Sequence, residues 1–114
     1  MAKKATLTGG IIGSGFAARI HYDGMQRVYA VNLDIAGVHS PTPENAKKFA
    51  TEREIATFDT VDALIDACDV VHICAPPARH EELAIKTLEA GKHAVVEKPL
   101  TGYFGDGSPD FHIG

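Results

Sequence analysis

The sequence predicts an α/β fold, a doubly wound parallel sheet in a single domain, from three observations. Short apolar runs alternate with stretches of helical composition along most of the chain. A glycine-rich turn joins the first apolar run to the first helical stretch. A chain of 114 residues has room for one hydrophobic core and no more. Strands separated by helices are typical of βαβ units, which place helices on both faces of a parallel sheet.

The first half of the chain predicts two strands and two helices. Residues 5–12 form a short apolar run ending in glycines, which favours a buried strand, and residues 16 to about 27 have helix-compatible spacing. Residues 35–39 predict a second strand, which a Ser-Pro-Thr-Pro sequence stops. Pro43 suits the first turn of a helix, and residues 44–52 are rich in helix formers.

The second half continues the alternation. Thr60 suits the N-cap of a helix that runs through residue 67, and Gly91 suits the C-terminal stop of a strong helix over 78–90. The remaining apolar runs predict three further strands, at residues 55–58, 70–74 and 93–97.

Composition excludes several classes of function. The net charge of −4, without a compensating basic run, argues against nucleic acid as a partner. No apolar run approaches the roughly 18–20 residues that span a bilayer, so we expect no membrane association. Cys68 and Cys74 match no zinc or C-x-x-C pattern, and the histidines lack metal-ligand spacing. We therefore expect two reduced thiols, a cytoplasmic protein and no metal.

The glycine turn has the pattern of a dinucleotide site. Gly13, Gly15 and Ala18 form a G-x-G-x-x-A motif between the first predicted strand and the first predicted helix. Gly13 allows a tight turn, Gly15 lets the backbone approach a pyrophosphate, and Ala18 permits close packing of the helix on the strand. The N-terminus of that helix offers unpaired N–H groups to an anion. In this context the motif favours nucleotide binding over a merely structural turn.

The residue that would meet the cofactor's ribose leaves NAD or NADP undecided. Ser40 stands about 20 residues beyond the motif, at the end of the second predicted strand. Ser40 is neither the acid that binds the ribose hydroxyls of NAD nor an arginine that would bind the 2′-phosphate of NADP. The hydroxyls of Ser40 and Thr42 can hydrogen-bond to the ribose of NAD or to the phosphate of NADP. In a weaker alternative, the second strand ends at Leu33 and Asp34 is the ribose acid.

Two further polar stretches leave the ends of later strands, where ligands bind in doubly wound sheets. Residues 74–80, Cys-Ala-Pro-Pro-Ala-Arg-His, leave the fourth strand, and residues 97–100, Glu-Lys-Pro-Leu, leave the fifth. His80 is equally well a ligand-facing donor or an ordinary first-turn helix residue. Glu97 and Lys98 are either a surface ion pair or a site that Pro99 holds rigid. We expect His21, on the first helix, to be a packing or capping residue.

Together the blocks GIIGSGFAARIH, GVHSPTPENAKKFA and DVVHICAPPARHEELAIKTLEAGKHAVVEKPL resemble the N-terminal domain of the glucose–fructose oxidoreductase / inositol dehydrogenase / MocA (Gfo/Idh/MocA) family. The resemblance covers residues 6 to 101. It implies a Rossmann domain that binds NAD(P), followed in the family by a larger α/β domain. Members mostly transfer a hydride between nicotinamide and a carbinol carbon of sugars, inositols and related polyols.

The resemblance also implies roles for individual residues. Lys98 corresponds to the lysine that contacts the reacting oxygen of the substrate and assists proton movement, and is the catalytic candidate. Ser40 and Thr42 correspond to residues that meet the adenosine ribose. The pyrophosphate would be wrapped by Gly13, Ser14, Gly15, Phe16 and Ala17. The rest of the cofactor's path would be lined by Ala75, Pro76, His80, Glu97 and Lys98.

The chain departs from the family pattern in two places. Pro41 stands where many relatives carry an arginine, and the second domain, which holds the family's catalytic histidine or aspartate, is not in this sequence. We expect residues 1–101 to form the cofactor domain and the glycine-rich residues 102–114 to begin a linker or insertion. We also expect no turnover by these residues alone, and homo-oligomers formed through the second domain.

Two alternatives to an oxidoreductase stay open at this point. One is a non-catalytic dinucleotide sensor on the same scaffold, and the other is a Rossmann-like domain for another ligand, such as a nucleotide or acyl-CoA. Lys98 in the Glu-Lys-Pro sequence favours the enzyme over both.

Overall fold

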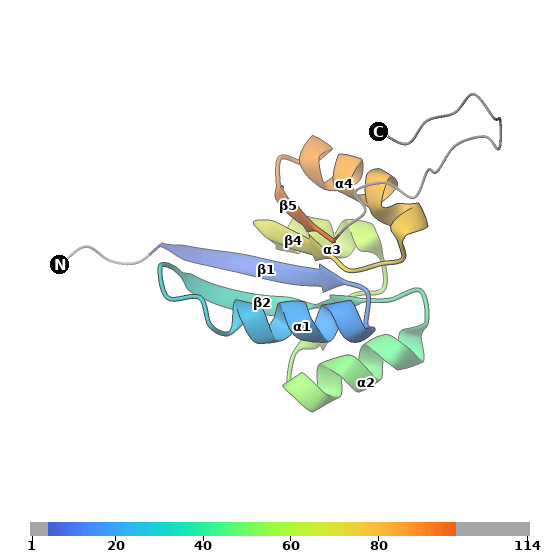
Figure 1. Ribbon diagram of the computed structural model, residues 1–114, viewed down its shortest axis with the longest axis horizontal. Coiled ribbons are helices and arrows are strands. Elements are labelled where there is room, and N and C mark those ends of the chain that lie inside the picture. Colours follow the sequence, from blue (N-terminus) through green and yellow to red (C-terminus); the bar gives the residue numbers. More distant parts are fainter. Residues whose placement is uncertain (1–4, 98–114) are drawn as a thin grey trace, which may run out of the picture.

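The computed structural model describes residues 5–97, which form a five-stranded sheet in the order β3-β2-β1-β4-β5. Figure 1 shows β2, β1, β4 and β5 side by side in this order. Every pair of neighbouring strands is parallel. The strands are β1 (Thr6–Ile12), β2 (Asn32–His39), β3 (Ala56–Thr57), β4 (Val70–Ile73) and β5 (His93–Val96). The helices are α1 (Phe16–Met25), α2 (Pro43–Arg53), α3 (Val61–Ala67) and α4 (His80–Glu89), with a 3₁₀ turn, η1 (Pro77–Arg79), before α4. The predicted doubly wound parallel sheet is confirmed.

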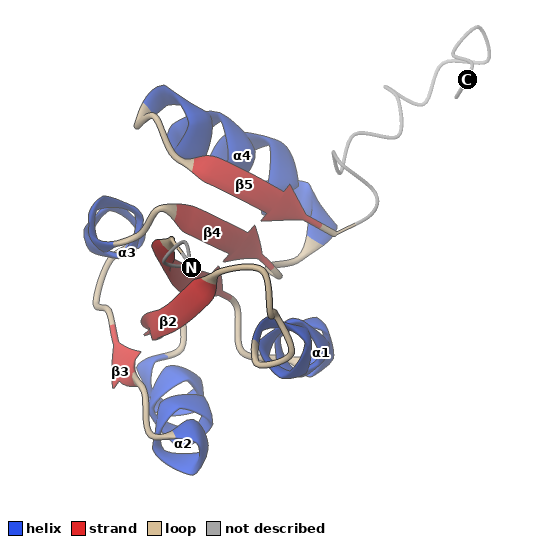
Figure 2. Cartoon of the chain, turned by 90° about the vertical axis from the view of Figure 1, so that its left-hand side faces the viewer, coloured by secondary structure: helices blue, strands red, loops and turns tan. Residues whose placement is uncertain are grey.

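Helices cover both faces of the sheet, with α1 and α2 on one side and α3 and α4 on the other (Figure 2). Because successive side chains of a strand point to opposite faces, Ile11 and Ile12 of β1 enter different cores. Ile11 packs with Ala18 of α1 and Phe49 of α2. Ile12 belongs to the core that holds Leu64 of α3 and Leu83 of α4.

The strand order places a crevice beside β1. From β1 the chain crosses by α1 to β2 on one side, whereas from β4 it crosses by α4 to β5 on the other side. The connections that follow β1 and β4 therefore lead to opposite edges of the sheet, and both begin outside the carboxyl ends of these strands. In open α/β sheets this reversal of strand order is the position at which ligands bind.

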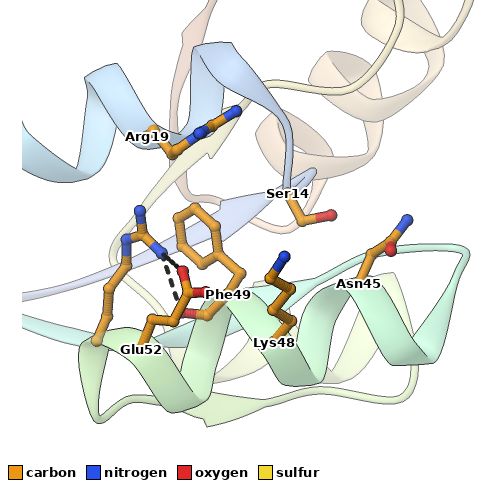
Figure 3. A pocket seen from close by; sticks show the side chains of 7 residues that line it. Ser14, Arg19, Asn45, Lys48, Phe49 and Glu52 are labelled. Atoms are coloured by element: carbon orange, nitrogen blue, oxygen red, sulfur yellow. Dashed lines mark hydrogen bonds and ion pairs between the residues drawn. The ribbon is translucent and has the colours of Figure 1, made fainter.

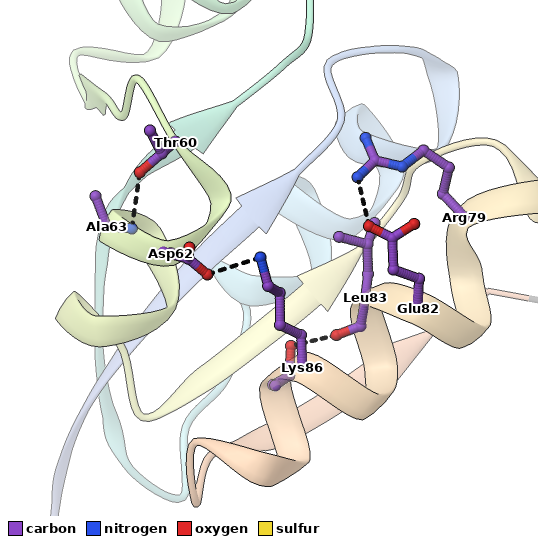
Figure 4. Close-up of polar contacts among 8 residues, drawn as sticks. Thr60, Asp62, Ala63, Arg79, Glu82, Leu83 and Lys86 are labelled. Atoms are coloured by element: carbon purple, nitrogen blue, oxygen red, sulfur yellow. Dashed lines mark hydrogen bonds and ion pairs between the residues drawn. The ribbon is translucent and has the colours of Figure 1, made fainter.

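Local signals at the helix ends are confirmed. Pro43 occupies the first turn of α2, and Gly91 follows α4 with a positive φ of 78°. The Thr60 hydroxyl accepts a hydrogen bond of 3.0 Å from the backbone N–H of Ala63 and so caps α3 (Figure 4). Lys86 of α4 and Asp62 of α3 form an exposed ion pair at 2.9 Å between the two helices, whose contribution to stability is small.

The second strand begins earlier than predicted, at Asn32 rather than at residue 35. Asn32 pairs with Thr6, and its N–H donates to the carbonyl of Ala5 at 2.8 Å, so backbone pairing with β1 holds this half-exposed end of the strand. Asp34 therefore lies inside β2, opposite Thr8, and the alternative in which the strand ends at Leu33 is wrong. Ser40 directly follows β2.

The helix predicted over 78–90 also differs at its start. Residues 77–79 form the 3₁₀ turn, and the α-helix begins only at His80. The N–H of Arg79 donates to the carbonyl of Pro76 at 2.9 Å, three residues earlier, which is the hydrogen bond of a 3₁₀ turn rather than of an α-helix. None of the helices within residues 5–97 is long and apolar enough to cross a membrane.

Candidate functional site

A cleft of about 390 Å³ lies at the carboxyl ends of β1, β2 and β4. It brings together three segments that are far apart in the sequence. The glycine turn contributes residues 13–15, the loop after β2 contributes residues 40 and 41, and the loop after β4 contributes residues 74–76. Six of the residues predicted for a cofactor line this one cleft: Gly13, Ser14, Gly15, Ser40, Ala75 and Pro76.

Gly13 shapes the floor of the cleft. Its φ of +112° is a conformation that side chains disfavour, and an added Cβ would lie 2.6 Å from the carbonyl oxygen of Cys74. Its N–H donates to the carbonyl of His39 at 2.7 Å, which ties the turn to the end of β2. The turn after β1 can therefore press against the loop after β4 only with glycine at this position, as the motif predicts.

Gly15 leaves space for a ligand. It precedes α1 with φ of −93°, and a Cβ built on it would meet nothing within 4 Å. A side chain here would therefore project into the open space of the cleft rather than clash with the protein. The first turn of α1 holds no acidic residue, and the N-terminal N–H groups of a helix lack acceptors within the helix. This cradle fits the pyrophosphate of a dinucleotide.

Phe16 and Ala17 begin α1 directly behind this cradle. Phe16 is 72% exposed, so its ring is not part of the hydrophobic core. Ala18 is fully buried between α1 and the sheet, which confirms its predicted packing role.

Ser40 is the residue that the sequence predicts to meet the ribose. It is 8% exposed, lines the cleft, and its Oγ accepts a hydrogen bond of 3.3 Å from the backbone N–H of Thr42. Thr42 is exposed and precedes α2 without a side-chain capping bond, so its hydroxyl has no partner within residues 5–97 that would compete with a ligand. Asp34 lines a different cleft, with Met25 and Leu33. No carboxylate lines the cleft that contains Ser40, within the part of the chain that the structure describes.

His80 holds the loop after β4 from behind. Its side chain is 1% exposed, and its Nε2–H donates to the carbonyl of Ala75 at 2.7 Å. The N–H of Cys74 donates to Ile12 at 2.8 Å, which fixes the other end of the same loop. His80 thus begins α4 as a buried residue that positions Ala75 and Pro76.

A polar network that sequence reasoning missed connects Glu97 to α1. The Nε2–H of His21 lies 2.5 Å from Oε1 of Glu97, and its Nδ1 lies 2.9 Å from Nδ1 of His72 on β4. The pKa of His72 is lowered to about 4 by burial and, to a lesser extent, by His21. His72 is therefore neutral at pH 7 and donates or accepts at Nδ1 as His21 requires.

One signal for the network is visible in the sequence. His72 interrupts the apolar run 70–74, between Val71 and Ile73, which both point into the α3–α4 core. Strand alternation therefore directs His72 to the face that carries α1. Lys98, the catalytic candidate that follows Glu97, lies outside the described residues.

The environment of the two thiols favours their protonated form. Burial raises the pKa of Cys74, at the edge of the cleft, to about 12, and the charge of Glu97 adds to the shift. The pKa of Cys68 is raised to about 11, chiefly by burial. Both cysteines are free and remain protonated at neutral pH.

Comparison with known proteins identifies relatives of this site. A family model described as an oxidoreductase family with an NAD-binding Rossmann fold (GFO_IDH_MocA) matches residues 7–108. UDP-N-acetylglucosamine 3-dehydrogenase of Acidithiobacillus ferrooxidans is 36% identical over 81% of this chain and 28% of its own length. Glucose-6-phosphate 3-dehydrogenase of Bacillus subtilis is 34% identical over 80% of this chain and 25% of its own length.

Solved structures agree with the sequence relatives. The Acidithiobacillus ferrooxidans enzyme superimposes with a TM-score of 0.76 at 32% identity, over 84% of this chain and 30% of that chain. Biliverdin reductase of Synechocystis, solved with biliverdin and NADP⁺, superimposes with a TM-score of 0.74 at 28% identity, over 82% of this chain and 30% of that chain. The chain thus spans between a quarter and a third of the length of these relatives.

Proposed function

The chain belongs to the Gfo/Idh/MocA oxidoreductase family, with its NAD-binding Rossmann fold, and from this we propose that it is the cofactor-binding part of a dehydrogenase acting on a carbinol carbon of a sugar or polyol. Sugar 3-dehydrogenases among its relatives support this class of substrate. We further propose that residues 1–101 form the cofactor domain, with residues 102–114 beginning a linker or insertion. Substrate binding and oligomer contacts would then belong to the second domain that the family resemblance implies.

The observation that carries the proposal is the cleft at the reversal of strand order, lined by residues 13–15, 40–41 and 74–76 and called the cofactor cleft from here on. Gly13 is held in a conformation that brings the turn against the loop after β4, while the position of a Gly15 side chain is left open. Both features serve a ligand whose pyrophosphate lies against the N-terminus of α1. When bound, the dinucleotide supplies the hydride acceptor or donor at nicotinamide C4.

The proposed roles of the remaining site residues are to bind and orient the cofactor and the substrate. We propose that backbone N–H groups of residues 15–17 hold the pyrophosphate, that Ser40 and Thr42 hydrogen-bond the adenosine ribose, and that Ala75 and Pro76 form one wall. In this assignment His80 acts by positioning that wall. Glu97, held by His21, sets the start of the segment that carries Lys98. Lys98 would stabilise negative charge on the substrate oxygen as its proton is lost.

Titration with NAD and NADP tests the proposal. We expect either dinucleotide to raise the melting temperature of the chain and to give a saturable heat of binding, while coenzyme A does neither. Gly15→Val fills the open cradle, so we expect it to weaken dinucleotide binding at least about tenfold, the equivalent of 1.4 kcal/mol. Gly24→Ala, also with nothing within 4 Å of an added Cβ, is the matched control and should leave binding unchanged.

Two results would count against the assignment. If neither dinucleotide stabilised the chain, the cleft would not be a cofactor site. If coenzyme A bound in their place, a domain for another ligand would be favoured. A cytoplasmic location is a separate proposal, supported by the two free cysteines.

A further inference from the structure

A second cleft, of about 340 Å³, lies between α1 and α2 and adjoins the glycine turn (Figure 3). Ser14 of the turn and Arg19 of α1 line it on one side, and Asn45 and Lys48 of α2 line it on the other. Four lining residues of α2 lie on one face of the helix, because their positions follow the pattern i, i+3, i+4, i+7: residues 45, 48, 49 and 52. Lys48 and Asn45 consequently project from α2 toward the turn, with Arg19 on the facing helix.

The cleft is cationic. Three basic side chains line it, and Glu52 is its one carboxylate within the described residues. Glu52 is engaged by Arg53 at 3.4 Å, and the Arg53 guanidinium stacks on Phe49 at 3.8 Å from the ring centroid. The charges of Glu52 and Arg53 therefore offset each other. None of the ion pairs within residues 5–97 involves Arg19 or Lys48. Two cations from two helices therefore remain available to an anion.

The position of this cleft relative to the cofactor cleft indicates which anion. Ser14 lines both clefts, and Ser40, which is placed to meet the adenosine ribose, lines the cofactor cleft with it. An acid in that cleft would grip the 2′-hydroxyl of NAD and repel a 2′-phosphate, and none lines it among the described residues. Pro41, directly after Ser40, offers no charge of its own.

We propose that Arg19 and Lys48 bind the 2′-phosphate of NADP in the cleft between α1 and α2, so that the chain prefers NADP to NAD. The inference rests on the proposed function, since it assumes a dinucleotide in the cofactor cleft. Guanidinium and ammonium groups are the usual protein partners of a phosphate, and Ser14 and Asn45 add neutral donors. In this arrangement cations on the two helices replace an arginine in the loop after β2.

The experiment compares ligands that differ by one phosphate. Dissociation constants of the native chain are measured by calorimetry for NADP against NAD, and for adenosine 2′,5′-bisphosphate against 5′-AMP. We expect each 2′-phosphorylated ligand to bind at least about tenfold more tightly than its partner. The double variant Arg19→Gln/Lys48→Gln should remove most of that difference and leave NAD affinity within about twofold. Glutamine keeps the helix propensity of both exposed positions.

Lys47→Gln is the matched control, because Lys47 is a neighbouring exposed lysine on α2 that does not line this cleft. We expect it to keep the native ratio. The inference is overturned if NAD binds as tightly as NADP, or if the double variant lowers both affinities by the same factor. It is also overturned if Lys47→Gln abolishes the preference as the double variant does. Failure of both dinucleotides to bind would instead refute the proposed function itself.

Discussion

His21 and Glu97 lie 76 residues apart in the sequence, yet Nε2 of His21 is 2.5 Å from Oε1 of Glu97. The contact joins α1, whose N-terminus forms the glycine-turn cradle, to the segment that leaves β5. On its other side His21 meets His72 of β4, with the two rings edge to face at 87°. One histidine thus links the two ends of the proposed cofactor site through side chains.

Replacing this histidine tests the link. His21→Phe keeps an aromatic ring but removes the part-buried hydrogen bonds of His21 with Glu97 and His72, so we expect a loss of about 1–3 kcal/mol in the free energy of unfolding. Urea denaturation at pH 7 measures it. Asp23→Ala, at an exposed position of the same helix, should change stability by no more than about 0.5 kcal/mol. Equal stability of the two variants would contradict the structural role.

The low pKa of His72 predicts that acid destabilises the fold. The unfolded chain takes up a proton at this residue near pH 6.5, while the folded chain does so only near pH 4. The stability is therefore fully present above pH 6.5 and decreases as the pH falls toward 4. Because the ring is only part-buried, we expect the loss to be on the order of 1–2 kcal/mol.

The change is followed by urea denaturation between pH 7.5 and 4, with His72→Gln as the comparison. Glutamine retains hydrogen-bonding groups for His21 but does not titrate, so this variant should show a shallower pH dependence over the same window. Superimposable pH profiles of the native chain and the variant would show that His72 does not carry the effect.

Gly13 and Gly24 are predicted to respond in opposite directions to the same substitution. Gly13→Ala forces a side chain into a φ of +112° and against the Cys74 carbonyl, so we expect a destabilisation of at least about 2 kcal/mol. Gly24→Ala adds a methyl group to open space inside α1 and should stabilise by about 0.5–1 kcal/mol. Thermal unfolding of both variants checks this, and a neutral Gly13→Ala would mean that the turn relaxes freely.

The threonines before α3 and α2 form another matched pair. Thr60→Ala removes the 3.0 Å hydrogen bond to the N–H of Ala63 and should cost about 1 kcal/mol. Thr42→Ala removes no side-chain capping bond, so we expect a distinctly smaller loss. Chemical denaturation of the two variants measures the difference, and equal losses would show that the cap at Thr60 contributes nothing particular.

Most of the cofactor cleft was predictable from sequence because it is built from loops that directly follow strands. Parallel strands bring their carboxyl ends to one edge of the sheet, so residues 13–15, 40 and 75–76 had to meet once the alternation of strands and helices was recognised. The role of His80 was not predictable in this way. Only the structure shows that His80 is buried and that its Nε2–H donates to the Ala75 carbonyl.

The sequence by itself determined the features that depend on local conformational preference. These are the turn at Gly13, the cap at Thr60, the helix start at Pro43 and the helix stop at Gly91. Only the tertiary structure decided where β2 begins, because backbone pairing with β1, not apolar pattern, holds residues 32–34. The tertiary structure alone also decided that His21 contacts Glu97 and that Arg19 and Lys48 line the same cleft. These relationships depend on how helices pack on a sheet, and residues distant in sequence carry no local signal of that packing.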